Sequence, residues 1–282
     1  MATAITTDST CDLSAALLKR YDVSMISLYI TLGEDTYKDG VDISPGELFA
    51  YVDRTGELPK TAAPSPEDYR AVFERLVSTG KEVVHIAFSS EMSASYSNAC
   101  RAAKQFESVH VIDSRSLSSG TGLLVIKAAE LASLGLSARE IAARVAALSP
   151  QVEASFVIDT LNYLHKGGRC SSVAALGANL LHLKPCIEVR DGRMQVSKKY
   201  RGTLKRCLNE YIRDRLEDRA DIDPSRAFIT HTVQDAALVE HARKVVHDSF
   251  PFAEVLVTDA GGTISSHCGP GTLGVLFLRK EA

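Results

Sequence analysis

The amino-acid sequence lacks several features that would assign it at once to a class of protein. No apolar run approaches the ~20 residues that a membrane-spanning helix needs, so no such helix is predicted. The 282 residues carry a formal net charge of −3, which excludes the global basic field typical of nucleic-acid-binding proteins. The six cysteines are scattered without a C-x-x-C pair and no signal peptide is evident, so we expect reduced thiols in a cytoplasmic protein.

Signatures of common enzyme classes are also missing from the sequence. There is no G-x-S-x-G elbow, no H-E-x-x-H helix and no G-x-x-x-x-G-K-[ST] loop. The histidines show no metal-like pairing, so neither a metal site nor a bound cofactor is predicted. Residues 269–274 match the G-x-G-x-x-G nucleotide pattern, but no helix is predicted after them. These glycines therefore indicate a tight loop beside His267.

Strand and helix signals alternate through the first half of the chain. The composition, 45% hydrophobic and 24% charged, is ordinary for a globular protein. A capping residue followed three positions later by an acidic one marks helix starts at Ser44, Ser65 and Ser137. This alternation predicts an α/β fold whose parallel sheet is covered by helices on both faces. The expected segments are strands at 3–7, 25–32, 83–88 and 109–113, and a long apolar helix at 118–134.

The second half has a different order of predicted strands and helices. Residues 187–190 and 194–200 flank Asp191-Gly192, a pair typical of a tight β-hairpin turn. Other strands are expected at 156–158, 227–232, 254–258 and 274–278, and helices at 171–182, 203–216 and 235–249. A hairpin combined with returning strands predicts a mixed sheet with helices. We therefore expect two domains, 1–150 and 151–282.

The most informative segment is 83–97, where a buried-looking strand runs into a turn crowded with hydroxyl groups. The turn precedes a helix expected from Ala94 to about Lys104. A helix N-terminus exposes backbone N–H groups and a positive dipole end, and short hydroxyl side chains add neutral donors. The loop is therefore predicted to cradle a carboxylate or a phosphate.

Two other positions are candidate ligand contacts, each with a structural alternative. His267 lies among glycine and serine, so its imidazole could reach a cleft and donate to an anion, or could be satisfied by the backbone. Gly167-Gly168 before Arg169 would turn the chain sharply and project a guanidinium, or would cap a helix beside a surface arginine.

Other polar residues near strands are given structural roles. His85 lies within a strand and is expected to be a core histidine. Asp8, Asp12 and Asp113 follow strands and are explained as N-cap or turn residues.

Taken in order, several short motifs resemble the DegV family of bacterial fatty-acid-binding proteins. Each motif is weak alone, but the ordered set covers nearly the whole chain and is specific. The motifs are TDSTCDL at 7–13, DG at 39–40, PKT at 59–61, SSEMSASY at 89–96, IDS at 112–114, LHKGGR at 164–169, LKP at 183–185 and HCGPGTLG at 267–274.

The resemblance implies a two-domain α/β protein that holds one long-chain fatty acid between its domains. Family members of this kind present the carboxylate to a separate ATP-dependent, dihydroxyacetone-kinase-like fatty-acid kinase, which forms an acyl-phosphate. By matching positions, Thr61 and Ser93 would hydrogen-bond the carboxylate, with His267 nearby. Arg169 and Arg201 would lie at the head-group mouth or take part in kinase docking. Transient contact with a membrane is compatible with this role.

Two departures from the family pattern affect the predicted head-group contacts. Ala62-Ala63 stand where the family commonly has Ser-Gln, and Ala94-Ser95 where Gly-Thr is usual. One hydroxyl near the head group is therefore expected to be missing.

The leading hypothesis is a carrier that is not itself an enzyme, with tunnel walls expected from residues 118–134 and 173–181. Two other functions stay open on the sequence. A serine-dependent hydrolase or transferase would use Ser93 as nucleophile and His267 as base on an acyl or phosphoryl substrate. A lipid-sensing regulatory protein would bind the fatty acid without presenting it to a kinase.

Overall fold

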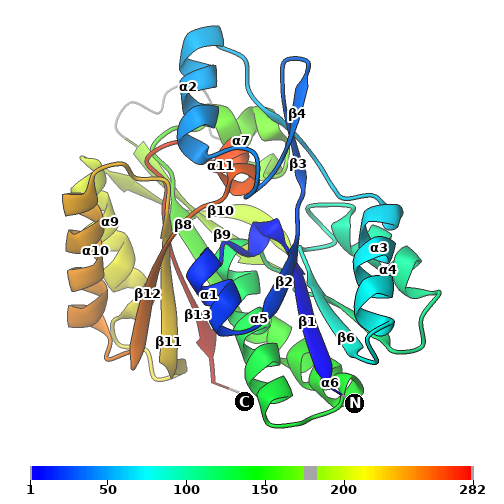
Figure 1. Ribbon diagram of the computed structural model, residues 1–282. Coiled ribbons are helices and arrows are strands. Elements are labelled where there is room, and N and C mark those ends of the chain that lie inside the picture. The colour runs from blue at the N-terminus through cyan, green and yellow to red at the C-terminus, as the bar shows by residue number, and fades with distance from the viewer. Residues whose placement is uncertain (1, 175–182, 281–282) are drawn as a thin grey trace.

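The computed structural model describes residues 2–174 and 183–280, whose strands form three sheets (Figure 1). The first sheet has the order β2-β1-β6-β7, and each of its pairings is parallel. Its strands are β1 (Thr3–Asp8), β2 (Val23–Ile26), β6 (Glu82–Ala87) and β7 (Val109–Asp113). The parallel sheet predicted for the first half is confirmed.

Helices cover both faces of this sheet, as predicted (Figure 1). They are α3 (Pro66–Val77) and α4 (Ser95–Ala103) on one face, and α5 (Ser118–Ser133) and α6 (Ala138–Leu148) on the other. The short helices η1 (Ser9–Cys11), α1 (Ala15–Arg20) and η2 (Ser149–Gln151) complete this half. Capping boxes begin the helices after Ser44, Ser65 and Ser137, so all three predicted helix starts are confirmed.

The second sheet is mixed, as predicted for the second half, with the order β10-β9-β8-β13-β11-β12. Its pairings are antiparallel except that between β11 and β12. The strands are β8 (Val152–Val157), β9 (Leu183–Arg190), β10 (Arg193–Arg201), β11 (Ile222–His231), β12 (Glu254–Asp259) and β13 (Leu273–Arg279). Asp191 and Gly192 both have positive φ, which confirms the predicted hairpin turn between β9 and β10.

Helix α5 lies between the two large sheets and belongs to the core of both (Figure 1). Leu124 and Ile126 are fully buried in a cluster that contains Ile5 of β1 as well as Phe228 of β11. The other face of the mixed sheet is covered by α9 (Leu204–Leu216) and α10 (Ala236–Ser249). The domain boundary near residue 150 stays a prediction.

The third sheet is a small antiparallel one that the sequence did not predict. It consists of β3 (Tyr29–Leu32), β4 (Asp35–Lys38) and β5 (Lys60–Ala62), beside α2 (Pro45–Thr55). The single strand predicted at 25–32 is wrong, because the chain leaves the first sheet after Ile26 and enters the third at Tyr29. Between them, the Leu28 backbone N–H donates to Ser9 Oγ, so it makes no ladder hydrogen bond at the break.

Three short helices occupy the second half where loops or a longer helix were expected. They are α7 (Asn162–Gly167), α8 (Ser171–Ala174) and α11 (Gly262–Cys268). His267 lies within α11, so the expectation of a loop applies only to the residues after it. There, Gly269 and Gly271 adopt positive φ. The helix predicted at 171–182 is described only as far as Ala174, and its remainder, with most of the wall expected from 173–181, lies outside the described residues.

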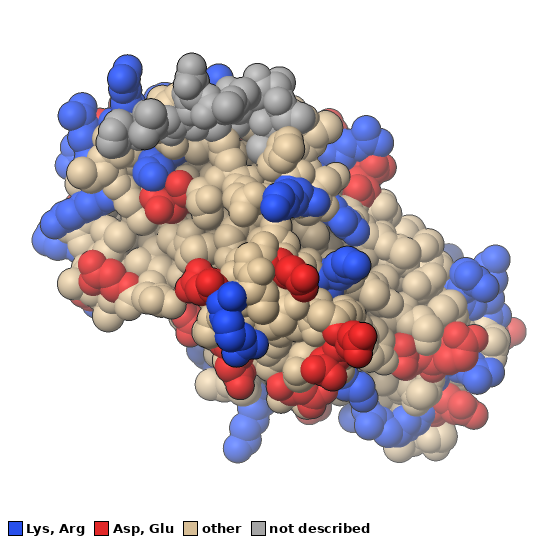
Figure 2. All heavy atoms as spheres, turned by 90° about the horizontal axis from the view of Figure 1, so that it is seen from above, with Lys and Arg blue, Asp and Glu red and all other residues tan. Residues whose placement is uncertain are grey.

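Charges of both signs are mixed on the face seen from above, where α2 and the β3–β4 hairpin lie (Figures 1 and 2). Within the described ranges, no helix has the length and apolar character needed to cross a membrane. All six cysteines fall within those ranges and are free.

Candidate functional site

A cavity of about 160 Å³ lies beside α11 and is lined by residues from both halves of the chain. Its polar lining residues come from four separate parts of the sequence and are Thr61, Ser93, Arg169, Thr263 and His267. Its apolar walls include Leu28, Phe88, Met92, Leu117, Met194 and Ile264. Four of the five predicted site residues are thus brought together around one largely apolar space.

Thr61 and His267 are in direct contact across the cavity wall. Antiparallel pairing of β5 with β3 sets Thr61 opposite Ile30, whose side chain is fully buried. The Thr61 Oγ1 lies 2.9 Å from Nε2 of His267, so the two side chains share a hydrogen bond. Residues 206 positions apart therefore form one polar unit.

The His267 imidazole is neutral at physiological pH. Burial lowers its pKa to about 4, and the nearby Arg169 charge acts in the same direction. The backbone at Gly167 packs against the ring so closely that a Cβ there would stand 2.4 Å from Nδ1. Within the described part of the chain, Nδ1 is buried and has no hydrogen-bond partner.

The hydrogen-bond balance favours a proton on Nε2 of His267. A buried N–H without an acceptor is rarer than a buried acceptor without a donor, so the unpartnered Nδ1 is assigned as the bare nitrogen. Nε2–H then donates to Thr61 Oγ1. The Thr61 hydroxyl proton is left to donate into the cavity.

Two buried aspartate side chains hold the start of α11 and thereby position His267. Asp12 Oδ1 accepts from the Gly261 N–H at 2.9 Å, and Asp39 Oδ1 accepts from the Gly262 N–H at 2.9 Å. Their second oxygens accept from the hydroxyls of Ser118 and Ser9 respectively. These side-chain oxygens satisfy backbone N–H groups that have no partner within the first turn of the helix.

The roles predicted for the three aspartates after strands are therefore only partly right. Asp113 is a turn residue, since it accepts from the backbone N–H groups of Ser90 and Arg115. Asp12 occupies a turn, but its side chain caps a helix 249 positions away. Asp8 makes no capping bond to the helix that follows and instead accepts from Tyr69, beside the core histidine His85.

The hydroxyl-rich turn before α4 contributes less to the cavity than predicted. Ser89 donates to the Gly192 carbonyl and Ser90 donates to Asp113, so both are used in local structure. Ser93 lines the cavity, and its Oγ accepts from the Ser95 N–H while lying 2.9 Å from the Ser95 Oγ. The predicted cradle thus reduces to Ser93 at the start of the helix.

The two predicted arginines are placed differently. Gly168 ends α7 with φ of 69°, and Arg169 donates to the Gly167 carbonyl while lining the cavity. Both interpretations of this motif therefore hold, since the glycine caps a helix and the arginine reaches the cavity. Arg201 is exposed at the end of β10 and is not among the described lining residues, so its part in docking stays a prediction.

Thr263 is a lining residue that the sequence analysis missed. Its hydroxyl is buried and has no partner among residues 2–174 and 183–280. Thr263 precedes His267 by four positions, so the two side chains share a face of α11. The i, i+4 spacing would have identified it, had the segment been predicted as a helix.

The sequence model of the DegV family, described as a family of uncharacterised proteins, matches residues 2–280. The chain belongs to the DegV family. A DegV domain-containing protein of Caldanaerobacter subterraneus subsp. tengcongensis is 33% identical over 281 residues, 98% of this chain and 99% of that protein. Another from Deinococcus radiodurans is 30% identical over 278 residues and covers 98% of both chains.

Solved structures of related proteins have the same fold. A Thermus thermophilus DegV family protein, described by its fatty-acid binding, has a TM-score of 0.89 and 31% identity, covering 99% of this chain and 100% of its own. A stearic-acid-binding protein of Eubacterium ventriosum has a TM-score of 0.87 and 27% identity, with 99% and 98% covered. A DegV lipid-binding protein of Thermotoga maritima has a TM-score of 0.87 and 26% identity, with 100% and 99% covered. These likenesses confirm the predicted DegV-like α/β fold.

Proposed function

We propose that this DegV protein binds a long-chain fatty acid in the cavity beside α11 and presents its carboxylate to a separate ATP-dependent fatty-acid kinase. The observation that carries the proposal is the convergence of Thr61, Ser93 and His267 on one apolar space. Fatty-acid binding is described for related DegV structures of the same fold. The protein would act as a carrier, in the cytoplasm, where the kinase and its ATP are found.

The carboxylate would lie at the Thr61 end of the cavity. An unpaired carboxylate in an apolar space is strongly disfavoured, so donors must converge on it. The Thr61 hydroxyl, with its proton free when His267 Nε2 donates to it, is one such donor. Ser93 and the unpartnered hydroxyl of Thr263 would be the others. Thr263 would then replace the hydroxyl lost where Ala62-Ala63 depart from the family pattern.

The acyl chain would run from the donors past Leu117 and Ile264. These two residues also line a second, smaller cavity, whose other walls include Phe156 and Leu276 of the mixed sheet. The described cavity is smaller than the several hundred Å³ typical of ligand pockets, so the walls must separate to admit a full chain. Burying ~14 methylenes at ~0.8 kcal/mol each supplies about 11 kcal/mol before ordering costs.

Neutral donors suit a carboxylate that must react later with ATP. A buried bidentate arginine would occupy both carboxylate oxygens and hold the charge firmly. Arg169 instead lies exposed at the cavity edge, where it would assist the kinase or the developing phosphate. Arg201, also exposed, would serve docking alone.

The geometry does not favour the serine-hydrolase alternative. Ser93 Oγ is bonded to Ser95, and within the described residues it makes no hydrogen bond to His267. A histidine whose pKa is lowered to about 4 is also a weak general base at neutral pH. A lipid-sensing protein would bind the fatty acid but would not support acyl-phosphate formation when the kinase and ATP are added, whereas the carrier would.

Thr61→Val should weaken fatty-acid binding by about tenfold, because it removes the donor and keeps the side-chain shape. The measurement is calorimetric titration of delipidated protein with oleate, alongside native mass spectrometry of the protein as purified. Thr36→Val, on the exposed edge strand β4, is the matched control and should leave the affinity unchanged. Wild-type protein that neither carries nor takes up a fatty acid would refute the proposed function.

Arg169→Ala should spare oleate binding and reduce acyl-phosphate formation about tenfold or more when kinase and ATP are added. Its side chain is exposed and bonded only to the Gly167 carbonyl among the described contacts, so the fold should tolerate the change. Arg206→Ala, at an exposed position paired with Glu210, is the charge-matched control. Loss of oleate binding in Arg169→Ala would show that the arginine holds the carboxylate directly.

A further inference from the structure

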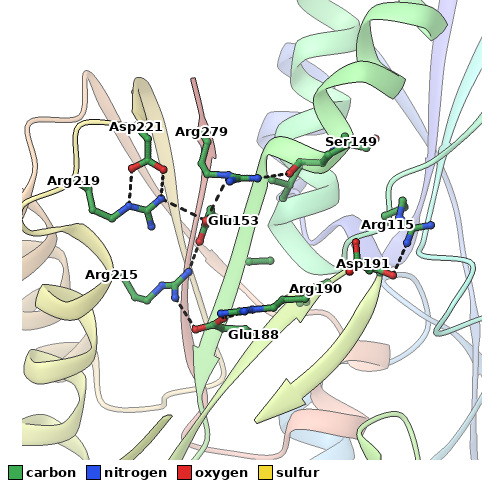
Figure 3. Close-up of a pocket in the computed structure, with 15 residues that line it drawn as sticks. Arg115, Ser149, Glu153, Glu188, Arg190, Asp191, Arg215, Arg219, Asp221 and Arg279 are labelled. Carbon is green, nitrogen blue, oxygen red and sulfur yellow. Dashed lines mark hydrogen bonds and ion pairs between the residues drawn. The ribbon is translucent and has the colours of Figure 1, made fainter. Parts of the chain in front are cut away.

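A separate cleft of about 640 Å³, larger than the fatty-acid cavity beside α11, lies where α9 and the mixed sheet meet the loop after β7 (Figure 3). It shares no lining residue with the fatty-acid cavity. Nine of its fifteen lining residues are charged. Figure 3 shows four of the five arginines gathered around Glu153 and Glu188, with Arg115 apart from them beside Asp191. The cleft is thus a separate and strongly polar space, sized for a small molecule.

Three guanidinium groups converge on the single carboxylate of Glu153 (Figure 3). Arg215 is hydrogen-bonded to Glu153, while Arg219 Nη2 lies 3.4 Å and Arg279 Nε lies 3.6 Å from its Oε1. One carboxylate cannot neutralise three guanidinium groups.

Neighbouring carboxylates offset only part of this excess. Glu188 is shared by Arg215 and Arg190, and Asp221 binds Arg219. The connected network therefore contains four arginines, Arg190, Arg215, Arg219 and Arg279, and three carboxylates, Glu153, Glu188 and Asp221.

Several donors of these arginines are unused within the described part of the chain. The Nε groups of Arg215 and Arg279 are buried and lack a hydrogen-bond acceptor. Arg115 lines the opposite side of the cleft, and its Nη2 donates to the backbone carbonyl of Asp191 at 2.6 Å. Its charge has no carboxylate partner among the described ion pairs. The cleft lining as a whole carries five arginines against four carboxylates, the fourth being Asp191, and an anionic ligand would balance the surplus positive charge.

We propose that this cleft binds a small phosphate-bearing molecule, held by Arg115, Arg219 and Arg279. These residues approach from the loop after β7, the segment after α9 and the end of β13, and so from different directions. A tetrahedral phosphate dianion can accept hydrogen bonds from donors that approach from several directions. The cleft already contains the planar carboxylate of Glu153, so a further carboxylate ligand is the less suitable candidate. Nine charged residues outnumber the apolar lining residues Pro150, Val152, Ala154 and Val189, so the cleft is poorly suited to an acyl chain.

Inorganic pyrophosphate is the probe for this site, titrated calorimetrically into the delipidated full-length protein at constant chloride concentration. We expect one site per chain with a Kd of ~0.1 mM or tighter. Arg115→Gln and Arg279→Gln should each weaken binding about tenfold or more, and Arg279→Lys should recover part of the loss. Arg206→Gln, on the exposed side of α9 with Glu210, should change nothing.

Several results would overturn this proposal. One is the absence of saturable pyrophosphate binding to folded wild-type protein, and another is unchanged affinity in both cleft variants. Arg115 is exposed and makes no ion pair within the described residues, so Arg115→Gln keeps the test valid if Arg279→Gln misfolds. Oleate binding should be the same in wild type and Arg115→Gln, so failure of the phosphate site is distinguishable from failure of the fatty-acid site.

Discussion

Replacing Gly122 by valine is expected to lower the free energy of unfolding by about 3 kcal/mol or more. Gly122 lies in α5, where an added Cβ would stand 2.9 Å from the Cys11 carbonyl oxygen and 2.9 Å from Leu13 Cδ2. The carbonyl belongs to the backbone of η1 and cannot rotate aside. Because α5 is packed between both large sheets, it cannot shift away without opening one of them.

Urea unfolding followed by circular dichroism measures this effect, with Gly122→Ala expected between valine and wild type. Gly46→Ala is the matched control, since its nearest neighbour would be Ser44 Oγ at 4.0 Å. Gly46 lies in the first turn of α2, where alanine should be neutral or stabilising by up to ~1 kcal/mol. An unfolding midpoint for Gly122→Val equal to that of wild type would show that Gly122 is not packed tightly against Cys11 and Leu13.

The contribution of Asp12 to stability should fall as the pH rises from about 5 to 8, because its carboxyl group resists ionisation in the folded protein. Burial raises the pKa of its carboxyl group to about 8, although the hydrogen bonds from Ser118 and Gly261 oppose the shift. Between the unfolded and folded pKa values of Asp12, its carboxyl group is protonated in the folded protein and ionised in the unfolded chain. Each pH unit in that window therefore costs on the order of 1 kcal/mol.

The measurement is the urea midpoint of wild type and Asp12→Asn across this pH range. Asparagine keeps the acceptor for the Gly261 N–H and cannot ionise, so the stability of the variant relative to wild type should increase as the pH rises through this range. Asp235→Asn, at the exposed N-cap of α10, is the control and should follow wild type. Parallel profiles for wild type and Asp12→Asn would rule out Asp12 as the titrating group.

Local signals in the sequence were sufficient for most of the two large sheets. The serine capping boxes and the Asp191-Gly192 turn depend on neighbouring residues alone, and each is present in the structure. The apolar helix after Leu117 was predicted almost to its ends, since a helix buried on all sides is apolar on all sides.

The errors occur where distant contacts decide the structure. The apolar run from Met25 to Leu32 has the composition of one strand, and only the hydrogen bond from Leu28 to Ser9 marks its division between two sheets. Helix α11 consists largely of small residues with low helix propensity. Its start is fixed by Asp12 and Asp39, more than 200 positions earlier.

The candidate site shows the same division. Motif resemblance identified Thr61, Ser93, Arg169 and His267, which all line the cavity. Thr263 belongs to none of the family motifs. The cleft lined by Arg115, Arg219 and Arg279 brings together arginines that are far apart in the sequence, where no local pattern marks them as a group.

The last strand of the chain, β13, occupies an interior place in its sheet, between β8 and β11. During synthesis, β8 therefore emerges without the neighbour that will separate it from β11. The apolar side of α5 that faces these strands therefore stays partly uncovered until Leu273–Arg279 have left the ribosome. Completion of this half thus depends on a strand that is synthesised long after β8, and the nascent chain is exposed to aggregation or chaperone capture until then.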